Sequence, residues 1–287
     1  MRGNKVSRSM LARAMQLATC AFAIATVVCF PRPTAAQEGP MLRFVRSPEE
    51  ISLTLTLLTK DGTITAGEPL LARTAVRNET NASLEVWASN SASRAMQFEV
   101  RDEEGRVVAS TPKPRIHVEG LQGIYSLNPG QTRTGNWVIT GLCQFTNPRV
   151  YEVRVTLWDF SGNQPKLAED SCVVRVLPYD PKRLEERCDE LFRPISSHGP
   201  YGNLPWTARV TALYSVRNEV VLPYLDWMAR EWSDGDACLA MLRLGTERAK
   251  KLLDSLAARH GEVGLAARRA KRMVLQPANV MWDMSGD

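Results

Sequence analysis

The chain has 287 residues, of which 44% are hydrophobic and 23% charged, and a formal net charge of +5. This composition is typical of a globular protein, and the length suggests about two domains at roughly 150 residues each. Five bases and no acid lie in the first 36 residues, so the remainder carries 31 bases against 31 acids. That balance excludes a protein that binds nucleic acid or an anionic membrane over its whole surface.

The first 36 residues have the pattern of a secretory signal peptide. A basic opening leads into the apolar run Leu17–Phe30, and Thr34-Ala35-Ala36 supplies the small residues that precede cleavage, which we expect before Gln37. The apolar run is shorter than the roughly 20 residues of a membrane span. We therefore predict an exported protein, periplasmic or secreted, with no stable membrane span after cleavage. The alternative is an uncleaved anchor.

Residues 37–50 are expected to form a flexible lead-in, and strands follow it. In Ile51–Leu57 apolar residues alternate with polar ones, which is the period of a strand with one buried face. Met96–Val100 alternates in the same way, and Asp102-Glu103-Glu104-Gly105 separates it from Val107, which predicts a hairpin whose glycine has a positive φ. Further strands are predicted at Leu71–Arg77, Leu84–Ala88, Gly135–Thr140, Tyr151–Phe160 and Cys172–Leu177.

The segments Phe98–Val108 and Leu127–Thr132, with Trp137 and the turn Arg77–Thr80, resemble the intracellular proteinase inhibitor type of bacterial β-sandwich. The resemblance covers about residues 51–177 and implies an immunoglobulin-like antiparallel β-sandwich. We assign residues 51–178 to this domain. The resemblance also implies protease inhibition, for which the proline- and glycine-broken loop Thr111–Gly123 is the candidate. The chain departs from that family in its export signal and its second domain.

After Pro178 the apolar period changes from two to three or four residues, which is typical of helices. Gly245 is expected to end one helix in a left-handed conformation, and Thr246 to cap the next. A weak repeat of ~29 residues resembles HEAT-like helix pairs. The predicted fold class is therefore multi-domain β + α. Residues 179–275 form a small HEAT-like α-helical domain, and 276–287 a flexible tail.

Four cysteines follow the signal peptide: Cys143, Cys172, Cys188 and Cys238. Export to an oxidising compartment favours disulfides. We favour the pairings Cys143–Cys172 and Cys188–Cys238, because each pair then stays inside one predicted domain. Four buried free thiols are the alternative. No CxxC or CxxH pair occurs, so no metal is predicted. HExxH, GxSxG, Walker A and GxGxxG motifs are also absent, so we predict no enzyme and no cofactor.

Six aromatic residues lie between Tyr201 and Trp232. Trp206 and Tyr224 fall on the apolar stripes and are expected in the core. Trp227 and Trp232 do not, so with Tyr201 they are the candidates for an aromatic groove that binds a peptide or glycan. The alternative is that these aromatic side chains belong to the core of the helical domain.

A basic cluster on the last predicted helix comprises Arg268, Arg269, Lys271 and Arg272, of which the three arginines are the named candidates. These side chains are candidates for contact with an acidic partner, and the alternative is a solvated helix face. The predicted function is that of an exported, non-enzymatic protein-binding or scaffolding protein of the bacterial cell envelope. Its partner is another protein or peptide, and not nucleic acid. The alternative function is a proteinase inhibitor that acts through a loop of the β-sandwich.

Overall fold

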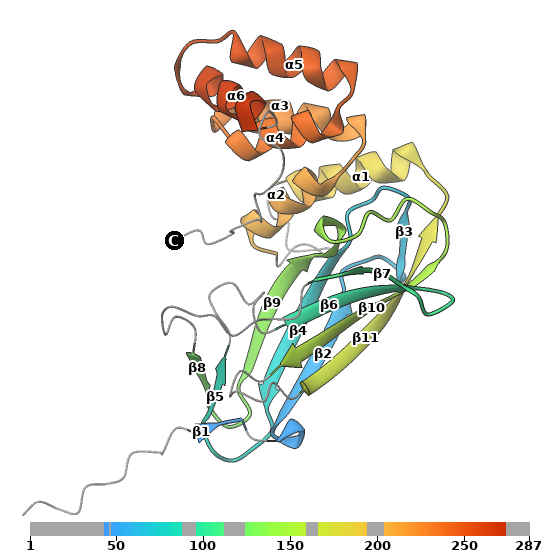
Figure 1. Ribbon diagram of the computed structural model, residues 1–287, viewed down its shortest axis with the longest axis vertical. Coiled ribbons are helices and arrows are strands. Elements are labelled where there is room, and N and C mark those ends of the chain that lie inside the picture. The colour runs from blue at the N-terminus through green and yellow to red at the C-terminus, as the bar shows by residue number, and fades with distance from the viewer. Residues whose placement is uncertain are drawn as a thin grey trace, which may run out of the picture. The chain divides into compact units, whose positions relative to one another are not determined.

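A computed structural model of the chain describes residues 43–45, 47–87, 96–111, 124–158, 166–193 and 204–273. Over these ranges the strands come first and the helices second, so the chain belongs to the β + α class (Figure 1). The last strand ends at Leu177 and the first α-helix begins at Pro181, which confirms the predicted change near Pro178. The signal-peptide segment 1–36 and the tail 276–287 lie outside the described residues.

The strands are β1 (Arg43–Phe44), β2 (Ile51–Leu57), β3 (Thr63–Thr65), β4 (Leu71–Asn78), β5 (Leu84–Trp87), β6 (Met96–Asp102), β7 (Val107–Ser110), β8 (Ile124–Leu127), β9 (Thr132–Val138), β10 (Val150–Trp158) and β11 (Lys166–Leu177). They form three sheets. The largest has the order β3-β11-β10-β6-β7, the second β2-β4-β9, and a small one β1-β5-β8. Every strand predicted from the sequence is therefore present, with ends that differ by up to three residues, except that β11 begins six residues before the predicted Cys172.

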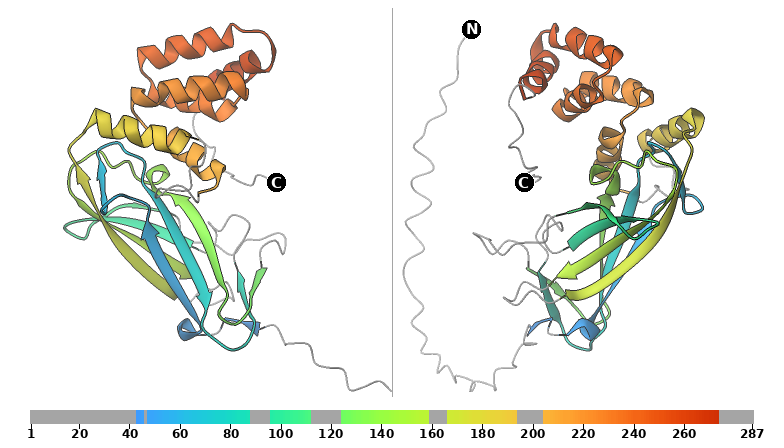
Figure 2. Two further views of the ribbon diagram at one scale, coloured as in Figure 1. Left: turned by 180° about the vertical axis from the view of Figure 1, so that it is seen from behind. Right: turned by 45° about the vertical axis from the view of Figure 1, so that its right-hand side comes forward.

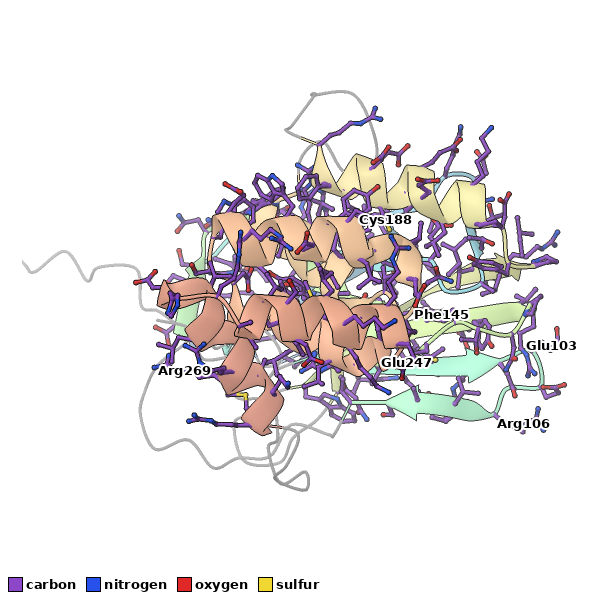
Figure 3. The ribbon with its side chains drawn as sticks, turned by 90° about the horizontal axis from the view of Figure 1, so that it is seen from above. Glu103, Arg106, Phe145, Cys188, Glu247 and Arg269 are labelled. Carbon is purple, nitrogen blue, oxygen red and sulfur yellow. The ribbon has the colours of Figure 1, made fainter. Side chains whose placement is uncertain are left out.

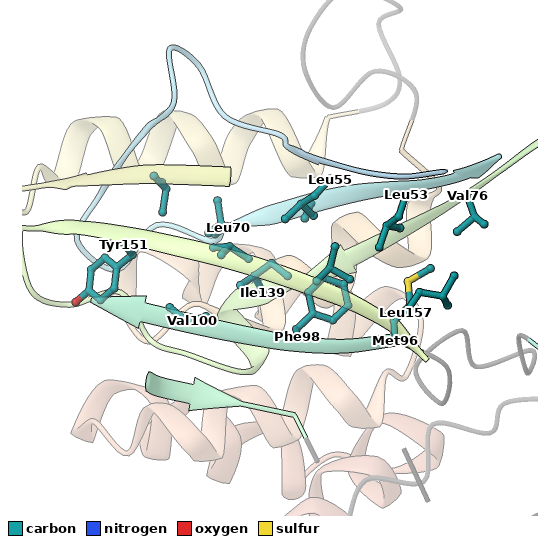
Figure 4. Close-up of a cluster of buried hydrophobic side chains, with 14 of the residues drawn as sticks. Leu53, Leu55, Leu70, Val76, Met96, Phe98, Val100, Ile139, Tyr151 and Leu157 are labelled. Carbon is teal, nitrogen blue, oxygen red and sulfur yellow. The ribbon is translucent and has the colours of Figure 1, made fainter. Parts of the chain in front are cut away.

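The two larger sheets share one hydrophobic core (Figure 4). The smaller of these sheets contributes Leu55 and Val76, and the larger contributes Phe98, Val100 and Val153. In the antiparallel pairing of β6 with β10, Val100 lies opposite Val153. Because side chains alternate along a strand, this register directs the apolar set of both strands to the same face. Figure 2 shows the strands from two further sides.

The predicted hairpin between β6 and β7 is confirmed. Gly105 has a φ of +77°, as the loop requires. The Asp102 carboxylate accepts hydrogen bonds from the backbone N–H groups of Glu104 and Arg106, at 3.1 and 2.9 Å. An acidic side chain at the first loop position thus closes the turn. Glu103 and Arg106, labelled in Figure 3, belong to this loop.

Two pairings depart from an all-antiparallel arrangement. Strand β3 pairs in parallel with the end of β11, and β1 pairs in parallel with β5. β3 has three residues between two turns, too few for an alternating pattern to be visible in the sequence. Part of the predicted flexible lead-in is also structured, because it contains β1, a 3-10 helix at Pro48–Glu50 and the buried Val45.

Side chains of β11 close the edge of β2, the outer strand of its sheet. The backbone N–H of Leu55 donates to Asp170 Oδ2 at 2.6 Å, and the Cys172 thiol donates to the Leu55 carbonyl at 3.0 Å. Both backbone groups in the middle of this edge strand are therefore satisfied by side chains. The two large sheets are joined here without a backbone ladder.

The described part of the chain contains α1 (Pro181–Phe192), α2 (Trp206–Ser215), α3 (Leu222–Glu231), α4 (Gly235–Leu244), α5 (Glu247–Ala257) and α6 (Gly261–Met273). Gly245 ends α4 with a φ of +67°, and the Thr246 side chain caps α5, as predicted. Helix α1 packs on α2, and α4 contacts α3, α5 and α6. None of these helices, within the described ranges, is long and apolar enough to cross a membrane.

A buried carboxylate joins the strands to the helices. Glu68 is 0% exposed and lies between β3 and β4. It accepts from Arg187 Nε at 2.6 Å, from Arg183 Nε at 3.3 Å and from the Thr65 backbone N–H at 2.8 Å. The strand residue Leu71 also lies in the hydrophobic core of the helices. The segments predicted as two domains therefore share a buried junction, and the described residues belong to one compact unit.

Gly264 is expected to be essential for the stability of the α5–α6 pair. A Cβ at this buried position would overlap the carbonyl oxygen of Arg259 and lie 2.8 Å from its carbonyl carbon. Alanine usually stabilises a helix interior by roughly 0.5–1 kcal/mol relative to glycine, but overpacking costs about 1–3 kcal/mol. We therefore expect Gly264→Ala to lower the free energy of unfolding by about 1–2 kcal/mol in urea denaturation.

The matched control for this substitution is Gly235→Ala at the start of α4. No atom lies within 4 Å of the Cβ position of Gly235. The control variant should be as stable as the parent chain or more stable. An unchanged urea midpoint for Gly264→Ala would contradict the predicted overlap with Arg259.

Candidate functional site

An aromatic cluster lies where the first three helices meet. Phe192 ends α1, Trp206 begins α2, Tyr224 and Trp227 lie on α3, and Trp232 directly follows α3. The rings contact one another in a continuous series. Helix packing therefore brings together aromatic side chains from three successive helices.

The turn between α3 and α4 positions Trp232. Its backbone N–H donates to the Met228 carbonyl at 3.0 Å and ends α3. Ser233 then adopts a φ of +54°, and Asp234 caps α4 by accepting from the Asp236 N–H at 2.8 Å. Because the left-handed Ser233 is followed directly by the N-cap residue of α4, the turn between α3 and α4 is short. The Trp232 ring is thereby held against Trp227.

Trp227 and Trp232 meet edge to face, with ring centroids 4.8 Å apart and ring planes at 84°. Trp232 meets Trp206 in the same way at 5.3 Å, and Phe192 meets Trp227 at 5.1 Å. Each contact of this kind stabilises by about 0.5–1.5 kcal/mol beyond the area it buries. Trp227 and Trp232 nevertheless remain 42% and 44% exposed. The cluster thus combines a packed interior with an exposed tryptophan pair in a fixed orientation.

Polar groups hold the inner side of the cluster. The Tyr224 hydroxyl donates to Asp189 Oδ1 at 2.6 Å, and burial together with this hydrogen bond raises the pKa of Tyr224. The Arg209 guanidinium lies 5.5 Å from the centre of the Trp206 ring, and burial lowers its pKa. Arg209 also donates to the carbonyls of Glu190 and Arg193. These contacts fix the end of α1 to α2 and α3.

The structure divides the aromatic residues discussed from the sequence into an exposed pair and a half-buried pair. Trp227 and Trp232 lie together and exposed, whereas Trp206 and Tyr224, expected in the core, are half-buried and pack against it. Tyr201 lies outside the described residues. Phe192, which is not among the candidates named from the sequence, also belongs to this site. Its position at the last residue of α1, next to a loop, was the available signal.

The arginines of α6 do not join the aromatic cluster. Arg268 Nη1 donates to the carbonyls of Ala257 and Arg259 at 2.7 and 3.2 Å, and so caps the end of α5. Arg269, labelled in Figure 3, and Arg272 are exposed. Among the described residues no hydrogen bond or cation–π contact connects these three side chains to the aromatic rings.

Neither predicted disulfide is present, because Cys143, Cys172, Cys188 and Cys238 are all free. The pairing argument used cysteine number and domain membership, which do not fix the geometry that a disulfide requires. Cys188 and Cys238 pack as small apolar side chains in the helical core, and burial raises their pKa values to about 12 and about 11. Burial also raises the pKa values of Cys143 and Cys172. The thiolate needed for oxidation is therefore disfavoured at each position.

Within the described ranges, no group of three or more His, Cys, Asp or Glu side chains is placed to hold a metal ion.

No protein-family model matches the chain, and no curated protein matches its sequence. Among solved structures, a β-glucosidase from Listeria innocua in complex with isofagomine is 16% identical with a TM-score of 0.27, over 45% of this chain and 16% of that one. The sporulation control protein Spo0M from Bacillus subtilis is 12% identical with a TM-score of 0.27, over 50% of this chain and 54% of that one. A β-glucuronidase from glycoside hydrolase family 2 is 12% identical with a TM-score of 0.29, over 44% and 13%.

The chain therefore spans less than two thirds of the length of each of these proteins. Their TM-scores, all below 0.3, support no argument about fold or function.

Proposed function

We propose that this chain is an exported, non-enzymatic protein-binding or scaffolding protein of the bacterial cell envelope. The observation that carries the proposal is the exposed pair Trp227 and Trp232, held edge to face by the aromatic cluster. Tryptophan is enriched among the residues that dominate binding energy at protein interfaces. Rings that are already fixed lose little conformational freedom when a partner binds. The partner we infer is a protein or peptide.

The proposal includes a finer description of the fold. We infer an immunoglobulin-like antiparallel β-sandwich at 51–178 and a small HEAT-like helical domain at 179–275. Two sheets around one core support the first, and consecutive packed helices support the second. Export is inferred from the signal-peptide pattern of residues 1–36. Both architectures commonly present binding surfaces, which agrees with the proposed role.

The test is capture of the partner by the full chain and by the double variant Trp227→Ala/Trp232→Ala. Each chain is exported with its own leader in its native bacterium, crosslinked, and analysed by mass spectrometry of the extracytoplasmic fraction. Loss of two hot-spot tryptophans typically weakens binding by at least about 2 kcal/mol, or roughly 30-fold. We therefore expect the double variant to lose most of the specific partner captured by the parent chain.

The matched control is Leu265→Ala on α6, because Leu265 is also 42% exposed. This variant should capture the partner as the parent chain does. Equal capture by the tryptophan variant would contradict the proposal. Inhibition of a serine protease by the full chain would instead favour the inhibitor alternative, whose candidate loop Thr111–Gly123 lies, beyond Thr111, outside the described residues.

A further inference from the structure

A groove of about 410 Å³ runs between α3 and α5. It shares no lining residue with the aromatic cluster. Its lining consists of Leu222, Pro223, Asp226, Arg248, Lys251, Leu252 and Ser255. The groove is therefore separate from the aromatic cluster, and its lining residues come from α3 and α5.

The groove combines apolar contact surface with positive charge. Leu222, Pro223 and Leu252 supply the apolar side chains, while Arg248 and Lys251 are exposed on α5. These two cations are three residues apart, so they lie on the same side of the helix. Apolar side chains flanked by cations suit a ligand that carries both apolar groups and carboxylates.

The groove cations lack partners in the described part of the chain. Arg248 and Lys251 form no ion pair or hydrogen bond there, whereas the neighbouring Lys250 pairs with Glu247 at 2.9 Å. Asp226, the acid of the groove, is already paired with Arg230 at 2.6 Å. The charge of Arg248 and Lys251 is therefore available to a ligand.

The surrounding helices increase this positive charge. Between Glu247 and Met273 the sequence has eight Lys and Arg against three Asp and Glu. The chain after residue 36 is balanced, with 31 of each. The basic character of α5 and α6 is thus a local property, and a local field attracts oppositely charged segments.

We propose that this groove binds an acidic amphipathic segment of a partner protein. The apolar side chains of that segment rest on Pro223 and Leu252, beneath which lies Leu222, only 2% exposed. Its carboxylates, spaced one helical turn apart, pair with Arg248 and Lys251. This binding does not require the tryptophan pair, so it can be tested independently of the function proposed above.

The probe is a fluorescent synthetic peptide with leucine and glutamate at helical i, i+3 and i+4 spacing, titrated into the full chain at low salt with fluorescence polarisation as readout. We expect saturable binding that weakens as salt is added. Arg248→Glu/Lys251→Glu should weaken binding by at least about tenfold, because two attractions become repulsions. Ser255→Trp, which fills the groove without changing its charge, should weaken binding as well.

The matched control is Arg269→Glu/Arg272→Glu on α6, which makes the same change in net charge outside the groove. It should weaken binding clearly less than Arg248→Glu/Lys251→Glu does, because Arg269 and Arg272 act on the ligand only through the local field and not by direct pairing. Trp227→Ala/Trp232→Ala should also bind the peptide as the parent does. Thermal melts of every variant verify that the chain remains folded.

Three results would overturn the proposal. One is an equal loss of affinity for the α6 control, which would mean that only net charge matters. Another is equal binding of a scrambled peptide with the same composition. The third is groove-dependent binding of phosphatidylglycerol vesicles but not of the peptide, which would identify the ligand as a membrane surface.

Discussion

Replacing Glu68 by alanine is expected to lower the free energy of unfolding by about 3–5 kcal/mol, because it removes one partner of a buried ion pair. Glu68 is 0% exposed, and its partner Arg187 is 6% exposed. The substitution takes the Glu68 carboxylate away from the buried Arg187 guanidinium, whose second carboxylate neighbour, Glu190 at 2.7 Å, is 53% exposed and therefore compensates the charge less well. Arg183 and the Thr65 backbone N–H also lose an acceptor.

Guanidinium denaturation of the full chain measures this effect. Glu68→Gln retains a hydrogen-bond acceptor and should lose less stability than Glu68→Ala. The matched control is Glu186→Ala on α1, because Glu186 is 64% exposed and lies 3.9 Å from Lys182. Surface pairs contribute about 0–1 kcal/mol, so this control should change little. Equal losses for the two alanine variants would show that the Glu68 junction does not stabilise the fold.

Replacing Phe98 by alanine is expected to cost about 3–5 kcal/mol, the usual range for a buried phenylalanine. Phe98 is 4% exposed, and its ring lies 4.8 Å from that of Trp137 across the core. The substitution leaves a cavity where β6 faces the second sheet, and rigid strands close such cavities only in part. The measurement is again the unfolding free energy of the full chain.

Val173→Ala provides the comparison for Phe98. Val173 lies on β11 in the same sheet and is 61% exposed. Its substitution removes little buried area and should change the unfolding free energy by less than about 1 kcal/mol. If Phe98→Ala lowered the free energy of unfolding as little as Val173→Ala does, the inference that the two sheets share one core would be wrong.

The sequence predicted the elements that carry a local signal. Strand β2 matches its predicted range Ile51–Leu57, because its alternation is complete. Gly105 and Gly245 have the positive φ values expected from their positions after a polar loop and a helix. In each case the signal lies within a few consecutive residues, so no knowledge of distant contacts was needed.

The features that the sequence did not predict depend on contacts between distant segments. Strand β8 follows a stretch rich in proline and glycine, and it is a strand because β5 pairs with it. Glu68 looks like an ordinary turn residue, and only the approach of α1 makes it a junction. The predicted cysteine pairings were wrong for the same reason, because the positions of cysteines along the sequence do not give the distances between their sulfur atoms in the fold.

The closed edge of β2 has a consequence for self-association. A second molecule that approached this strand to extend its sheet would find the amide and carbonyl of Leu55 already engaged by Asp170 and Cys172. Templated addition of a foreign strand, the first step of fibril growth, would have to break both bonds before any new ladder formed. The side chains that join the two sheets therefore also oppose polymerisation along this strand.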